Sequence, residues 1–157
     1  MGVSGSGKTT LGKLLASKLN CSFLEGDDYH SPQNIRKMAE GKPLTDRDRN
    51  PWLRKIASEL KRHALAKERC VVACSALKRK YRNVVFSNLK GARLIYLSGE
   101  IEQIRNRMKN RSHFMPTLLL ESQFRVLERP TPDEQPIIID IKLKKEECLK
   151  KILAQIS

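Results

Sequence analysis

Apolar residues recur every three or four positions along much of the chain, which is the spacing of amphipathic helices. The first such stretch carries four leucines and predicts a helix from Lys8 to about Asn20. One more helix is predicted by its end signals, since Ser31-Pro32 suits a helix start and Gly41 a stop. Further stretches with helical spacing lie at about 51–64, 101–108, 120–127 and 149–156.

Short apolar runs lie between these helices and predict buried strands. The runs are at 21–25, 70–74, 92–97 and 137–141. Asn50-Pro51 is expected to open the helix that precedes the second run. Because strand and helix alternate throughout, we expect an α/β fold with a parallel sheet and helices on both faces. A length of 157 residues fits a single domain over 1–157.

The first ten residues, M-G-V-S-G-S-G-K-T-T, fit the spacing G-x-x-x-x-G-K-[ST] of a loop that binds nucleoside triphosphates. Such a loop turns its backbone N–H groups toward an anion, and glycines reach the conformations that this requires. Lys8 is expected to contact the β- and γ-phosphates and Thr9 to bind Mg²⁺. The residues predicted to bind ATP are Gly2, Val3, Ser4, Gly5, Ser6, Gly7, Lys8, Thr9 and Thr10.

A loop of this kind normally follows a buried strand, yet only Met1 precedes Gly2. The first strand is therefore expected to be missing, through truncation, a late start of the reading frame, or replacement by another segment. If it is absent, we expect weaker folding or weaker nucleotide binding.

Two acidic residues follow the run at 21–25. If the extended conformation persists, Glu25 and Asp27 share one side at the carboxyl end of a strand, where open α/β sheets bind ligands. Phosphoryl transfer needs a group that orients the acceptor hydroxyl and takes its proton, and Asp27 is our candidate. Glu25 is a candidate for holding Mg²⁺. The alternative is that Asp27-Asp28 only caps a turn.

Basic residues crowd before Ser112 and suggest a lid over about 105–118 that closes on the triphosphate and excludes water. Arg107 and Arg111 lie four positions apart on one helix face and are the candidate lid cations. An exposed, solvated helix face is the competing explanation. His30 and His113 either contact the substrate or cap local backbone.

The formal net charge of +14 raises the possibility of nucleic-acid binding, but the basic residues are spread over every segment and aromatic residues are few. Nucleic acid is therefore an unlikely partner. The four cysteines include no C-x-x-C pair, so neither a disulfide framework nor a zinc site is expected. Without a secretory signal or a membrane-spanning run, we expect a cytoplasmic protein with no membrane contact.

Taken together, these motifs resemble the gluconokinases, which are P-loop small-molecule kinases related to shikimate and adenylate kinases. The segments D-R-N-P-W and C-S-A-L-K are more specific than the phosphate loop alone. The matching segments lie at 1–9, 26–30, 34–38, 43–53, 74–82 and 113–128, in the family's order.

The resemblance implies ATP-dependent phosphorylation of D-gluconate to 6-phosphogluconate, a helical lid, and a possible homodimer. It makes Asp27 the substrate-orienting base and places the loop at 130–135 against adenine. A basic lining suits a sugar acid, whose carboxylate pairs well with arginine and lysine. For Trp52, a place in the core is the alternative to packing on the substrate. The other implied cleft residues are His30, Arg49, Ser75, Lys78 and Arg82.

Two other functions remain open at this point. One is a related kinase with another acceptor, such as shikimate. The other is a weakened nucleotide- or RNA-binding protein, which the absent first strand and the positive charge make conceivable. The segment R-S-H-F is one residue shorter than the usual lid ending of the family, which affects the alignment of Arg111.

Overall fold

Strands and helices alternate along the chain in the computed structural model, which describes residues 1–87, 89–109 and 117–156. The strands are β1 (Ser22–Glu25), β2 (Cys70–Ala73), β3 (Ile95–Ser98) and β4 (Ile137–Asp140). The helices are α1 (Lys8–Lys18), α2 (Pro32–Ala39), α3 (Asp46–Leu65), α4 (Arg79–Val85), α5 (Ile101–Lys109), α6 (Thr117–Val126) and α7 (Lys145–Ile156). Two short 3₁₀ helices cover Gly26–Tyr29 and Pro132–Glu134.

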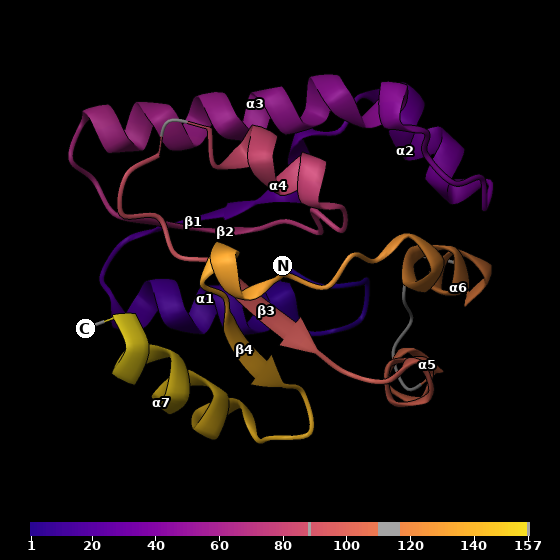
Figure 1. Cartoon of the computed structure of the whole chain (residues 1–157). Helices are drawn as coiled ribbons and strands as arrows, with labels where there is room; N and C mark the ends of the chain where they lie inside the picture. Colours follow the sequence, from indigo (N-terminus) through magenta and orange to yellow (C-terminus); the bar gives the residue numbers. More distant parts are fainter. Residues whose placement is uncertain (88, 110–116, 157) are drawn as a thin grey trace.

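The strands form two parallel pairs, which confirms the predicted parallel arrangement. β1 pairs with β2, and β3 pairs with β4. Met1 lies between the pairs, where its amino group donates to the carbonyl of Ile95 and its carbonyl accepts from the N–H of Leu97 at 2.9 Å (Figure 1). A cavity of about 620 Å³ lies alongside, with Met1 and residues of β2 and β3 among its lining.

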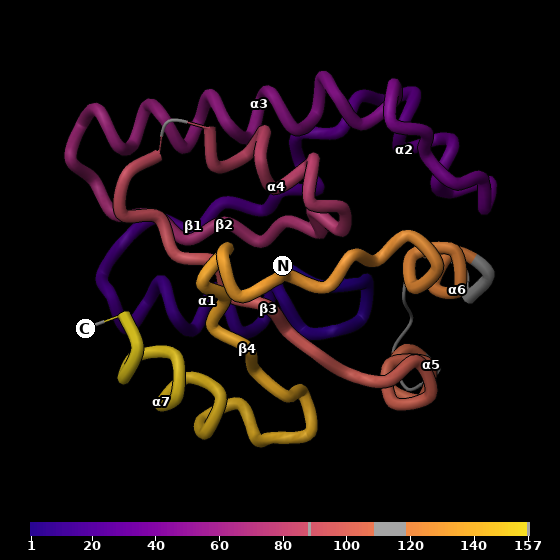
Figure 2. The backbone as a smooth tube through the Cα atoms, in the orientation of Figure 1, coloured from indigo at the N-terminus to yellow at the C-terminus, as the bar shows by residue number. Residues whose placement is uncertain are grey.

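Helices cover both faces of this arrangement, as predicted (Figures 1 and 2). α3 and α4 lie along one side of the β1–β2 pair, whereas α1 lies on its other side and packs against α7. The apolar core has two parts. One gathers around α1, β3, β4 and α7, with Ile139 and Ile152 almost fully buried, and the other lies under α3 and α4, with Ile56 at its centre.

α3 begins five residues earlier than the sequence pattern predicted. Thr45 caps the helix: its hydroxyl accepts from the N–H of Asp48, and the Asp48 carboxylate accepts from the N–H of Thr45. This reciprocal capping box satisfies N–H groups that a helix start leaves free. Pro51 therefore lies inside α3 instead of opening it. The early start brings Asp46 into the first turn, close to α4.

Candidate active site

The phosphate loop, residues 2–10, has the backbone shape of an anion cradle. Gly7 has φ of 99° where α1 begins, and Gly5 has φ of 77° with no room for a side chain, because a Cβ there would lie 2.8 Å from Met108. Such left-handed conformations turn successive N–H groups toward one point. The Lys8 ammonium folds back over the loop and donates to the carbonyl of Val3 at 2.9 Å.

One hydrogen bond joins the phosphate loop to the end of β1. The Thr9 hydroxyl donates to the Glu25 carboxylate at 2.7 Å. Burial lowers the pKa of the Lys8 ammonium, whereas the nearby carboxylates of Asp27 and Glu25 raise it. The structure therefore places the phosphate loop next to the carboxyl end of β1, directly before the acidic turn.

The acidic turn itself differs from the expectation. Gly26–Tyr29 is a 3₁₀ helix, so Asp27 does not continue the alternation of β1. Gly26 causes the change of direction by packing against β2, where a Cβ would lie only 2.4 Å from the carbonyl oxygen of Ala73. The Asp27 side chain remains 67% exposed, which leaves its carboxylate free to meet a ligand.

His30 and Trp52 lie directly behind this turn. Their rings stack with centroids 4.2 Å apart and an interplanar angle of 15°. Trp52 is only 4% exposed and its indole N–H donates to the carbonyl of Gly26 at 2.6 Å. Of the two positions that the sequence left open for Trp52, the structure therefore favours the core over the cleft wall.

His30 is a neutral side chain near neutral pH. Burial lowers its pKa to about 4, an effect that Asp27 opposes. Its Nε2 lies 4.0 Å from a carboxylate oxygen of Asp27, and its Nδ1 is buried without a hydrogen-bond partner in the described part of the chain. The ring therefore supports Asp27 from the interior.

A cationic group flanks the turn and centres on Tyr81. The guanidinium of Arg49 and the ammonium of Lys78 lie 5.6 and 5.5 Å from the centre of the Tyr81 ring. Hydrogen bonds from Lys80, Tyr81 and Lys78 hold the pKa of the Asp46 carboxyl well below its usual range. Ser75, directly after β2, is partly exposed.

Sequence reasoning missed both Asp46 and Tyr81. The available signal was the T-x-x-D capping box, which places Asp46 at the start of α3.

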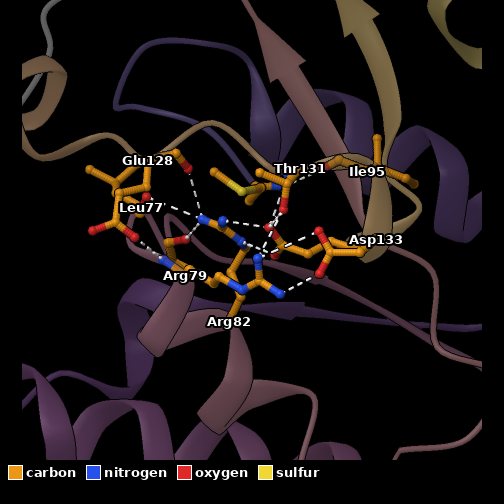
Figure 3. Close-up of polar contacts among 10 residues, drawn as sticks. Leu77, Arg79, Arg82, Ile95, Glu128, Thr131 and Asp133 are labelled. Carbon is orange, nitrogen blue, oxygen red and sulfur yellow. Dashed lines mark hydrogen bonds and ion pairs between the residues drawn. The ribbon is translucent and has the colours of Figure 1, made fainter.

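Arg82 does not line the cleft, which corrects the role that the family resemblance implied. It is 2% exposed, and its guanidinium donates to the Glu134 carboxylate at 2.5 and 2.8 Å. The same guanidinium donates to three backbone carbonyls, that of Glu128 at 2.9 Å among them (Figure 3). These contacts occupy the donors of the side chain, so Arg82 serves the fold.

The loop at 130–135 is also placed differently from the expectation. Thr131 and Asp133 accept hydrogen bonds from Arg79, at the start of α4 (Figure 3). The loop thus packs on α4, and residues 142–146, after β4, lie beside the phosphate loop instead.

A second cavity, of about 580 Å³, lies beside the phosphate loop. Its lining includes Gly5, Thr10, Arg107 and residues 141–146. Arg107 donates to the carbonyl of Ile141, which holds the arginine at this cavity. Arg111, His113 and the middle of the expected lid lie outside the described residues.

A lysine-bearing anion loop that faces a carboxylate turn at the end of a neighbouring parallel strand defines the class of P-loop kinases. The comparisons with known proteins agree. A family model described as shikimate kinase matches residues 4–157. The structures of an adenylyl-sulfate (APS) kinase and a deoxyadenosine kinase share the fold at 18% and 16% identity, with TM-scores of 0.69 and 0.67.

More similar proteins narrow the class. The thermosensitive gluconokinase of Escherichia coli is 42% identical over 160 residues, covering 98% of this chain and 86% of that protein. The Arabidopsis thaliana gluconokinase is 38% identical, covering 100% and 90%. A gluconokinase structure from Sinorhizobium meliloti has a TM-score of 0.88 and 42% identity, covering 99% and 88%. The chain belongs to the gluconokinase family.

Proposed function

We propose that this protein transfers the γ-phosphoryl group of ATP to a hydroxyl of D-gluconate, giving 6-phospho-D-gluconate. The observation that carries the proposal is the hydrogen bond between Thr9 and Glu25, which joins the phosphate loop to the strand end that leads into Asp27. Membership of the gluconokinase family supplies the identity of the acceptor.

The residues at the loop fit a Mg²⁺ ion bound together with the nucleotide. Thr9 and Glu25 offer hard oxygen ligands 2.7 Å apart, and Mg²⁺ in kinases takes one or two protein oxygens along with phosphates and water. Among the described residues no group of three or more His, Cys, Asp or Glu is placed to hold a metal ion. When bound, the ion neutralises charge on the phosphate oxygens.

The protein's own residues divide the remaining work. Loop N–H groups and Lys8 hold the β- and γ-phosphates, and Arg107 adds positive charge from the other side of the loop. Asp27 accepts a hydrogen bond from the attacking hydroxyl, orients it in line with the γ-phosphorus, and takes its proton as the new bond forms. Arg111 and His113 are proposed to complete the lid.

The cationic group around Tyr81 is suited to the carboxylate of gluconate. Lys78 and Arg49 present positive charge on the Asp27 side of the cleft. In the absence of substrate the Lys78 ammonium donates to Asp46 at 3.0 Å, and the gluconate carboxylate would bind as its second anionic partner. Ser75 would contact the hydroxyls, whereas the buried His30 would act through Asp27. The base and ribose of ATP would occupy the 580 Å³ cavity on the other side of the loop.

Phosphoryl transfer from ATP, measured in parallel with gluconate, shikimate and nucleoside monophosphates, tests the proposal. We expect turnover with gluconate to exceed that with the other acceptors by orders of magnitude. Turnover of shikimate alone would assign the protein to a related kinase. Salt-sensitive RNA binding without any phosphoryl transfer would instead support a binding protein.

No helix of the described chain is both long and apolar enough to cross a membrane. We propose in addition that the protein forms a homodimer, and light scattering of the purified protein at several concentrations tests this.

A further inference from the structure

Trp52 makes two contacts with the acidic turn, and both are directional. Its indole N–H donates to the carbonyl of Gly26, one residue before Asp27. Its ring stacks on His30, three residues after Asp27. A core residue chosen only for its volume needs neither contact, because an aliphatic or phenyl side chain fills space equally well.

The turn has little freedom once these contacts are made. On its inner side Gly26 lies against the backbone of Ala73, with no space for even a methyl group. On its outer side the N–H of His30 donates to the carbonyl of Asp27 at 3.2 Å. The indole N–H thus holds the orientation of the Gly26 carbonyl. The orientation of this peptide in turn sets the direction in which the Asp27 side chain points from the backbone.

We propose that Trp52 is a positioning residue for phosphoryl transfer, holding Asp27 in front of the phosphate loop through the Gly26 carbonyl and the His30 ring. This inference rests on the proposed function, in which Asp27 orients the acceptor hydroxyl. A small displacement of such a group lowers the rate of the chemical step strongly while leaving distant binding contacts intact.

Trp52→Phe separates positioning from packing, because it keeps a ring against His30 and removes the N–H donor. Ile56→Val is the matched control: it lies one turn further along α3 in the same part of the core, is 1% exposed, and is outside the acidic turn. We expect Trp52→Phe to slow the single-turnover chemical step at least about tenfold with the KM for ATP nearly unchanged. Ile56→Val should keep the full rate.

Trp52 is the only tryptophan in the sequence, so intrinsic fluorescence reports on it directly in the unaltered protein. We expect gluconate to cause a saturable change in its emission, because the indole touches the turn that receives the acceptor. This measurement does not require a variant to fold.

The outcomes are distinct. If the unaltered protein does not phosphorylate gluconate, the proposed function fails. If it does, but Trp52→Phe keeps the same single-turnover rate as Ile56→Val, the positioning role is overturned. An emission spectrum that stays unchanged at gluconate concentrations that saturate turnover overturns it as well.

Discussion

Asp27 combines an exposed carboxylate with a tightly held backbone, which is the arrangement a general base requires. We expect Asp27→Asn to lower the turnover number by about 10²–10⁴-fold, because the amide no longer takes a proton. The affinity for ATP should stay within about twofold, since the phosphate loop is untouched. Steady-state kinetics and calorimetric titration with ATP measure the two effects. Near-normal turnover would contradict the assignment of Asp27 as the base.

His30 makes the stability of the protein depend on pH in an acidic window. Its pKa is about 4 in the folded protein and about 6.5 when exposed, so between these values the unfolded chain binds more protons. The free energy of unfolding therefore rises with pH through this window, by up to about 3 kcal/mol. Urea unfolding of the original protein and of His30→Gln from pH 4 to 7 measures the difference. Equal slopes in both proteins would contradict this origin.

At the scale of single residues, the sequence predicted local motifs better than it predicted contacts between residues that lie far apart in the chain. The left-handed glycines next to Lys8 and Thr9 follow from the local spacing of the phosphate loop, whereas the 3₁₀ turn that carries Asp27 did not follow from strand alternation. Arg82 was misassigned, since its partner Glu134 lies 52 positions away and no local pattern reports such a pair.

Among the elements, α4 depends most on one polar contact. The Arg82–Glu134 pair ties the helix to the loop before β4, and both side chains are largely buried, at 2% and 11% exposed. Removing one partner of a buried pair leaves an uncompensated charge and costs about 3–5 kcal/mol. We therefore expect Arg82→Met to destabilise the protein by that amount.

Arg79→Met is the matched control for this variant. Arg79 pairs with Asp133 at the surface, at 48% and 59% exposed, so its loss should cost at most about 1 kcal/mol. Denaturant unfolding of the two variants gives the comparison. Equal losses of unfolding free energy would show that the buried Arg82–Glu134 pair contributes no more to stability than the exposed Arg79–Asp133 pair.

The extent of each element was predictable where apolar spacing governs it. The strands and five of the seven helices of the described chain follow from that pattern, and α2 from its caps. Two features escaped. The early start of α3 depends on side-chain capping by Thr45, and α4 is a short helix whose basic sequence shows no apolar stripe.

For the whole molecule, we expect stability to respond to what fills the cavity of about 620 Å³ between the two strand pairs. Met1 and residues of β2 and β3 line the cavity at this gap, and Met1 already makes two hydrogen bonds to β3. Adding five apolar, β-branched residues before Met1 should extend this pairing and fill the cavity with apolar side chains. We expect the melting temperature to rise by several degrees, at roughly 2–4 °C per kcal/mol for a chain of this length.

An extension of the same length made of glycine and serine is the control, because it has no apolar surface to bury. Calorimetry of both extended proteins measures the difference. Identical melting temperatures would show that apolar side chains in the cavity do not stabilise the protein.

The division into two strand pairs also has a consequence for how the enzyme responds to stress. Asp27 and the cationic group belong to the half built on β1 and β2. The 580 Å³ cavity beside the phosphate loop is lined in part by residues from β3, β4 and the segment after β4. Two features connect the halves: α1 packs against both of them, and the Arg82–Glu134 ion pair joins α4 to the loop before β4. Mild heating that weakens the contacts between the two halves would misalign donor and acceptor while each half keeps its helices. Such a kinase would lose activity at a temperature below its melting temperature.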